Sequence, residues 1–105
     1  MVELLIRHGA EINLLDSNGY TALMLAADKG HELVVELLLQ HGAEISLQSS
    51  DGGTALMAAA HHGRERVVEL LLQHGAEVNL QNSTGRTALM AAAGQGHERV
   101  VVLLR

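Results

Sequence analysis

The stretch TALMLAADKGHELVVELLLQHGAEI, residues 21–45, carries the pattern that decides the fold. Its first four letters return at Thr54 and again at Thr87, each time 33 positions further along the chain. Aligned with that offset, residues 13–45 and 46–78 agree at 22 of 33 positions. A period of this length is the sequence signature of a repeat protein, in which each unit is one small supersecondary motif.

Within each unit, local signals predict two short helices joined by a tight turn. Thr21 is suited to cap the first helix, because its hydroxyl can accept an unpaired backbone N–H. Gly30 is typical of a helix end. A second helix is expected over residues 32–41, where Val and Leu form a broad apolar face, and Gly42 ends it. That glycine belongs to the motif HGAE, which stands at residues 8–11, 41–44 and 74–77. One such pair cannot bury its own apolar face, so neighbouring units must stack.

The letters also carry a family resemblance. Residues 18–45, NGYTALMLAADKGHELVVELLLQHGAEI, closely resemble the ankyrin repeat, whose pattern runs G-x-T-P-L-H-x-A-A-x-x-G-H, then V-V-x-L-L-L, then G-A. The likeness covers the whole chain and implies an all-α solenoid of stacked antiparallel helix pairs with protruding loops. His31 and His97 match the structural His of the family, and Arg64 stands in its place in the middle unit. The Pro and His of the T-P-L-H motif are replaced here by Ala and Met.

We expect a single domain, residues 1–105, made of a partial repeat and three further repeats; their bounds are 1–12, 13–45, 46–78 and 79–105. Neither end shows a dedicated polar cap, which solenoids normally need for solubility. Exposed apolar faces are usual marks of association. We therefore expect head-to-tail self-association through the two uncapped ends, which present Leu4, Leu5 and Ile6 at one end and Met90, Val101 and Leu104 at the other.

Composition limits the classes of partner. The formal net charge is −5 with all seven His neutral, whereas a protein that binds a nucleic-acid backbone needs a basic face. The chain has no Cys, which excludes disulfides, thiolate chemistry and a Cys-based zinc site. No signal-peptide pattern or long apolar run is present, so we expect a soluble protein without a membrane partner, intracellular if natural.

The seven His and twelve carboxylates do not form a convincing catalytic or metal site. His8, His41 and His74 are one repeated position, and stacked helices lie about 10 Å apart, too far to share one zinc ion. His61 and His62 break the repeat, but consecutive residues of a helix point apart, so any metal binding there is expected to be weak. We predict no catalytic residue, no cofactor and no metal.

The candidate binding residues are the positions that differ between units while the framework stays constant. The ankyrin resemblance implies that partners bind the loop tips and the concave face of the first helices. These positions are Ser17, Asn18, Tyr20, Asp28 and Lys29; Ser50, Asp51, Gly53, His61 and His62; and Ser83, Thr84, Arg86, Gly94 and Gln95. The alternative is that they are ordinary solvated loop residues, because only Tyr20 and Arg86 are of the types that dominate binding energy.

The leading interpretation is a non-catalytic protein–protein interaction scaffold whose protein partner is unknown. The alternative is an engineered or consensus-like repeat chain, made for stability or assembly, without a native partner. The near-identity of the units and the start within a repeat suggest either an engineered chain or a fragment of a longer array. An enzyme is the least favoured class, because almost every polar residue is a repeated structural one.

Overall fold

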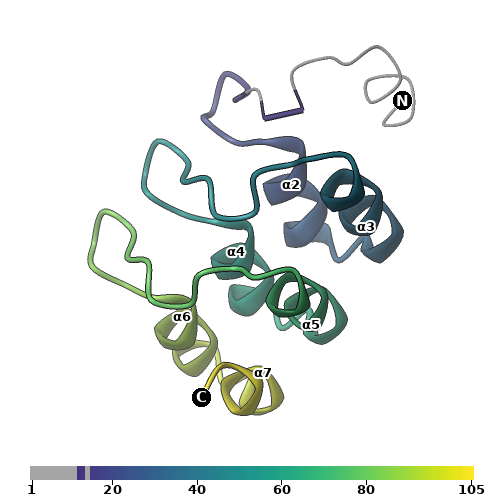
Figure 1. Cartoon of the computed structure of the whole chain (residues 1–105). Helices are drawn as coiled ribbons and strands as arrows, with labels where there is room; N and C mark the ends of the chain where they lie inside the picture. The colour runs from purple at the N-terminus through teal and green to yellow at the C-terminus, as the bar shows by residue number, and fades with distance from the viewer. Residues whose placement is uncertain (1–11, 14) are drawn as a thin grey trace.

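The computed structural model describes residues 12, 13 and 15–105, which form six α-helices and no strand. Three pairs follow one another along the chain (Figure 1): α2 (Ala22–Lys29) with α3 (Glu32–Gln40), α4 (Ala55–His61) with α5 (Glu65–Gln73), and α6 (Ala88–Gly94) with α7 (Glu98–Leu104). The predicted all-α helix-pair solenoid is confirmed. Residues 1–11 of the expected partial repeat lie outside the described residues.

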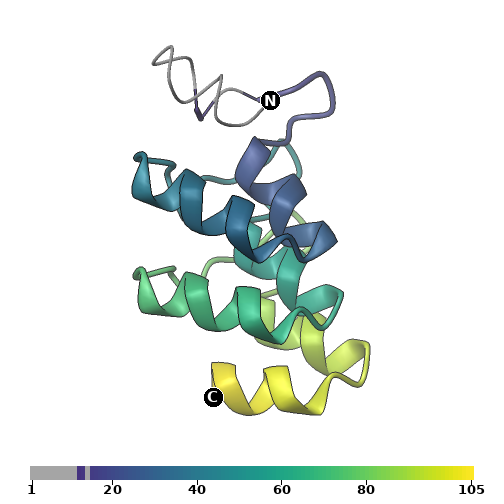
Figure 2. The same ribbon diagram turned by 90° about the vertical axis from the view of Figure 1, so that its right-hand side faces the viewer.

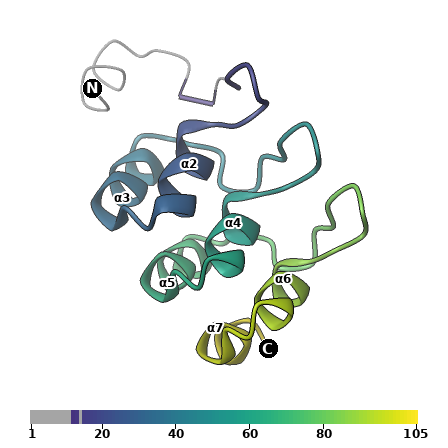
Figure 3. The same cartoon turned by 180° about the vertical axis from the view of Figure 1, so that it is seen from behind.

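The three pairs stack in two layers. The first helices α2, α4 and α6 form one layer, and the second helices α3, α5 and α7 form the other (Figures 1 and 3). Seen from the side of the second helices, α3, α5 and α7 lie one below another along the stack (Figure 2). The loops before α4 and α6 project away from the second-helix layer (Figure 1). The stack therefore has a face made of first helices and loops.

The helix starts follow the predicted caps. Thr21, Thr54 and Thr87 have extended backbones, and each hydroxyl oxygen accepts the backbone N–H three residues later, at 3.2, 3.2 and 3.3 Å. Gly30 ends α2 with a φ of 75°, and its N–H donates to the carbonyls of Ala26 and Ala27. A left-handed φ of this kind strains any residue that has a Cβ, which accounts for the glycine.

The repeated HGAE motif ends the second helices. α3 stops at Gln40, one residue before the expected position, and His41 is its C-cap. The His41 ring donates from Nδ1 to the Leu37 carbonyl at 2.8 Å, and His74 does the same to Leu70 at 2.9 Å. Carbonyls in the last turn of a helix have no partner within the helix. His41 and His74 therefore cap the ends of α3 and α5.

The core is aliphatic and continuous through all three pairs. Its largest fully buried side chains come from both layers: Leu23, Leu56, Leu71, Val35, Val67, Val68 and Val100. Ala59 and Ala60 of α4 are also fully buried. These small residues let α4 approach α2 and α6 closely, and apolar burial between such helices is the main stabilising contribution.

Polar contacts between neighbouring repeats recur with the same period. Arg64 Nε donates to the Asp28 carbonyl at 3.1 Å, and one repeat later His97 Nε2 lies 3.0 Å from the His61 carbonyl. Arg64 therefore takes the place of the structural His, as the sequence indicates. The HGAE loop also reaches back, because the Glu77 N–H donates to the Ser46 hydroxyl of the preceding repeat at 3.1 Å.

Candidate functional site: the concave groove

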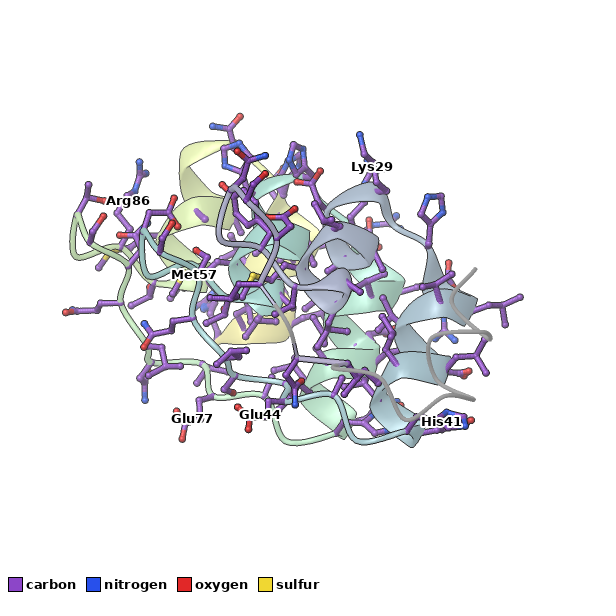
Figure 4. The ribbon with its side chains drawn as sticks, turned by 90° about the horizontal axis from the view of Figure 1, so that it is seen from above. Lys29, His41, Glu44, Met57, Glu77 and Arg86 are labelled. Carbon is purple, nitrogen blue, oxygen red and sulfur yellow. The ribbon has the colours of Figure 1, made fainter. Side chains whose placement is uncertain are left out.

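A groove of about 480 Å³ lies between the loops and the first helices α2, α4 and α6. Its apolar floor is formed by Met24, Leu25, Met57, Ala58 and Ala91. Figure 4 shows Met57 close to the loops, whereas His41, Glu44 and Glu77 of the HGAE motifs lie toward the opposite edge of the molecule from Lys29. The groove thus belongs to the first helices and loops.

The loop wall of the groove is shaped by one repeated position. The carboxylate of Asp16 accepts the N–H groups of Asn18 and Tyr20, both at 2.9 Å. One and two repeats later, the same place is taken by Ser49 and Asn82. Short polar side chains commonly bind their own backbone in this way and hold a turn. This position was not among the predicted site residues, although its period of 33 and its place three residues before a glycine are visible in the sequence.

Asp51 sits at the tip of the middle loop, where its own turn holds the carboxylate. The Ser49 hydroxyl donates to Asp51 Oδ1, and the Gly53 N–H donates to the same oxygen at 3.3 Å. These two hydrogen bonds, the Ser49 bond first, lower the pKa of Asp51 below its ordinary 3.8. The Asp51 carbonyl also accepts the Ser83 N–H at 2.8 Å, which joins the middle loop to the next.

We expect the lowered pKa of Asp51 to make the middle loop sensitive to acid. Because the folded pKa lies below the unfolded one, the stabilisation is complete above the unfolded pKa and is lost as the pH falls through the folded pKa. Carboxyl chemical shifts followed by NMR should give a midpoint below 3.8. The free energy of unfolding of the wild type and of Asp51→Asn can be measured in urea between pH 6 and roughly pH 2. We expect the wild type to lose its advantage over Asp51→Asn only at the acidic end of this range. A midpoint above the ordinary value would contradict the assignment.

The end of the groove near the helix C-termini is lined by Asp28, His61 and His62. His62 Nε2 lies 2.8 Å from Asp28 Oδ1, a contact between two repeats. The expectation that the two His point apart is wrong, because their ring centroids are 4.8 Å apart in an edge-to-face arrangement. α4 ends at His61, and His62 is its C-cap residue.

Comparison with known protein families agrees with this architecture. A family described as ankyrin repeats (3 copies) matches residues 1–49 and 43–105. The chain belongs to the ankyrin-repeat family. Ankyrin repeats are generally non-catalytic modules for protein–protein interaction. A search of curated proteins finds no match.

The ankyrin architecture brings only part of the predicted binding set into the groove. Five of the predicted side chains line it: Tyr20, Asp28, Asp51, His61 and His62. Gly53 lines it as well. The remaining predicted residues are exposed but lie outside the lining: Ser17, Asn18, Lys29, Ser50, Ser83, Thr84, Arg86, Gly94 and Gln95. Figure 4 shows Lys29 pointing away from the body of the molecule and Arg86 on the loop side.

The apolar floor of the ankyrin groove was not among the predicted site residues. Leu25 is 45% exposed, although it lies in a helix whose other large apolar residues are buried. A signal was available, because Leu25 stands where the other repeats have Ala58 and Ala91. Met57 could not be found in this way, since all three repeats have Met at its position.

Two further properties concern the described part of this ankyrin chain. Within residues 12, 13 and 15–105, no group of three or more His, Asp or Glu is placed to hold a metal ion. None of the six helices in this part is long and apolar enough to cross a bilayer.

Proposed function

We propose that this chain binds a partner protein through the concave groove and acts as a non-catalytic scaffold. The proposal rests on one observation: positions that differ between the repeats lie together in the groove. Tyr20, Asp28 and Asp51 differ from their equivalents in the other repeats, and all three line one groove. The residues that hold the stack, such as Thr54 and Leu56, are repeated instead.

The chemistry of the groove supports this proposal. Protein-binding surfaces combine an apolar centre with a polar rim. Here Leu25 and Tyr20 are 45% and 37% exposed beside the nearly buried Met57, and Asp28 and Asp51 lie at the edges. Tyrosine is among the residue types that contribute most to binding energy when a partner covers it.

The test is a binding selection with a variant that fills the groove. A random library of peptides, each of about twelve residues, is selected against the immobilised protein and against Gly53→Tyr. This substitution suits the fold, because Tyr20 occupies the equivalent position and the backbone of Gly53 is not in the left-handed region. A Cβ at Gly53 would approach only the Ser49 and Asp51 side chains, at 3.3 and 3.4 Å.

We expect the selected peptides to bind the wild-type protein and to lose binding to Gly53→Tyr. The control is Gln73→Tyr, which adds the same side chain to an exposed position of α5, outside the groove lining. Circular dichroism should show that both variants keep the helical content of the wild type. A failure to select any peptide, or peptides that bind Gly53→Tyr as well as the wild type, would count against the concave groove as the binding surface.

A competing proposal is that the chain is an engineered or consensus-like array without a native partner. The observation that favours it is the agreement of neighbouring units at 22 of 33 positions. Such an array has no selected binding surface. The same selection separates the two ideas, since an array without a binding surface should yield no peptide family that depends on the groove.

A second candidate function is self-association through the outer face of α6 and α7. Met57 is 8% exposed beneath the next repeat, whereas the equivalent Met90 is 48% exposed. Ala60 is fully buried and its equivalent Ala93 is exposed. The opposite face, with Leu4, Leu5 and Ile6, lies outside the described residues, so the head-to-tail geometry stays a prediction.

Light scattering over a hundredfold range of concentration tests the association. We expect the mean mass to rise with concentration, and Ala93→Glu to weaken this rise by placing a charge in the apolar face. Gln95→Glu adds the same charge beside that face at an exposed position and is the control. A constant monomer mass would rule the association out.

A further inference from the structure

We propose that the occupant of the groove is a protein segment in which a bulky apolar side chain stands next to a lysine or arginine. This inference rests on the proposed function, since it names the chemistry of the partner for the same groove. It follows from an apolar space that one glycine leaves open and from the distribution of charge along the lining.

The apolar space lies at the middle repeat. Gly53 occupies the position that Tyr20 fills in the preceding repeat and Arg86 fills in the next. Gly53 lines the groove but adds no side chain to it, and Met57 lines the same groove. Leu25 also lines the groove and is 45% exposed. An apolar side chain of a partner would remove this surface from water, which is favourable.

The small residues of the floor set the size of this space. Ala58 and Ala91 line the groove at positions where α2 carries Leu25. The groove is therefore deeper over α4 and α6, where small side chains leave space, and is narrowed by a large side chain over α2. The total volume of about 480 Å³ falls in the range of ligand pockets and has room for a few side chains, but not for a helix pair. A short extended segment suits this volume.

The charge of the groove decides the second feature of the occupant. Two carboxylates line it, Asp28 and Asp51, and among the described residues no Lys or Arg belongs to the lining. The hydrogen bonds of Asp51 favour its charged form. His61 and His62 also line the groove, and His62 contacts the Asp28 carboxylate. Carboxylates gathered in one groove attract cations and disfavour anions.

The neighbouring cations do not change this conclusion. Lys29 and Arg86 are exposed, and neither lines the groove. Figure 4 shows them far apart, with Lys29 directed away from the molecule. An acidic segment could meet them only outside the groove. The charged groups that line the groove include the carboxylates of Asp28 and Asp51 but no Lys or Arg, so the charged residue of the partner should be Lys or Arg, and this charge steers the approach.

The experiment uses the sequences of the peptides selected above. We expect peptides with Leu, Ile, Met or Phe adjacent to Lys or Arg to be enriched about fivefold or more over the input library. Selection on Asp28→Asn/Asp51→Asn should keep the apolar preference and lose the Lys or Arg preference. Both substitutions preserve an acceptor, and Asn18 already occupies the position equivalent to Asp51. Leu25→Ala should weaken the apolar preference instead. Alanine is suited to this position, because the equivalent residue of the next repeat is Ala58.

A binding cycle then measures the charge contact directly. One selected peptide and its Lys→Gln or Arg→Gln form are titrated by fluorescence polarisation against the wild type and the double Asn variant. We expect the peptide change to weaken binding to the wild type about fivefold, the size of a favourable exposed charge pair, and binding to the variant by less than about twofold.

Each outcome bears on a different claim. Groove-dependent peptides that are enriched in Asp or Glu, or that lack the cation, would overturn this inference while leaving the proposed function intact. An equal loss of affinity for both proteins in the cycle would also overturn it, because the cation would then contact something other than the two carboxylates. A selection without any groove-dependent peptide would remove the proposed function itself.

Discussion

Leu56→Ala is expected to lower the free energy of unfolding by about 2–5 kcal/mol. Leu56 lies in α4, the central first helix, and is 1% exposed between the repeats on either side. Truncation removes apolar contacts and leaves a cavity that the stacked helices fill only in part. A small domain has a total stability of about 5–15 kcal/mol, so the loss is a large share of it. Urea unfolding followed by circular dichroism measures the change.

The matched control is the same substitution at an exposed position. Leu25→Ala removes the same atoms from α2, but Leu25 is 45% exposed and the equivalent residues are Ala58 and Ala91. We expect it to cost less than about 1 kcal/mol, because little buried surface is lost and no closed cavity forms. Equal costs for the two substitutions would mean that the stack does not bury Leu56 as the structure describes.

Gly52→Ala is expected to be strongly destabilising for two separable reasons. Gly52 has a φ of 81°, in the left-handed region, where an L-residue costs about 1–2 kcal/mol. In addition, a Cβ there would lie 2.9 Å from Asn82 Cα and 3.0 Å from the Ser83 backbone nitrogen. Those atoms belong to the next loop, whose Ser83 N–H is bound to the Asp51 carbonyl. The substitution must therefore push two repeats apart.

Gly85→Ala separates the local cost from the contact between repeats. Gly85 has the same φ of 81° at the equivalent position, but a Cβ there would meet no atom within 4 Å among the described residues. It should show the backbone cost alone, about 1–2 kcal/mol. We expect Gly52→Ala to exceed it by at least about 1 kcal/mol, the scale of overpacking. Equal losses in urea unfolding would show that the loops do not touch closely.

The helix boundaries could be predicted from the sequence because their causes are local. Thr21 and Gly30 act on backbone groups within a few residues, so their spacing alone predicts where α2 begins and ends. The period of 33 then predicts the other pairs and the need to stack them. The end of α3 differs by one residue, since His41 turns its ring back onto the Leu37 carbonyl and acts as a cap.

The candidate site could be predicted only in part. Comparison of the repeats points to Tyr20, Asp28 and Asp51, because variation at a repeated position is visible in the letters alone. It cannot identify Met57, which is constant, nor can it separate the predicted residues that line the groove from those, such as Ser83, that lie outside it. Residues far apart in the sequence share a groove only through the way neighbouring repeats pack.

What the sequence by itself determined is therefore the repeated unit: its period, its caps, its two helices and the positions at which one unit differs from another. The tertiary structure alone decided which of these variable residues lie next to one another. His62 contacts Asp28 of the preceding repeat, and Leu25 of one repeat lines the same groove as Gly53 of the next. The physical reason is that capping acts over three or four residues of the chain. A groove depends instead on how far neighbouring helices are offset from one another, and this offset is set by the packing of the whole apolar core.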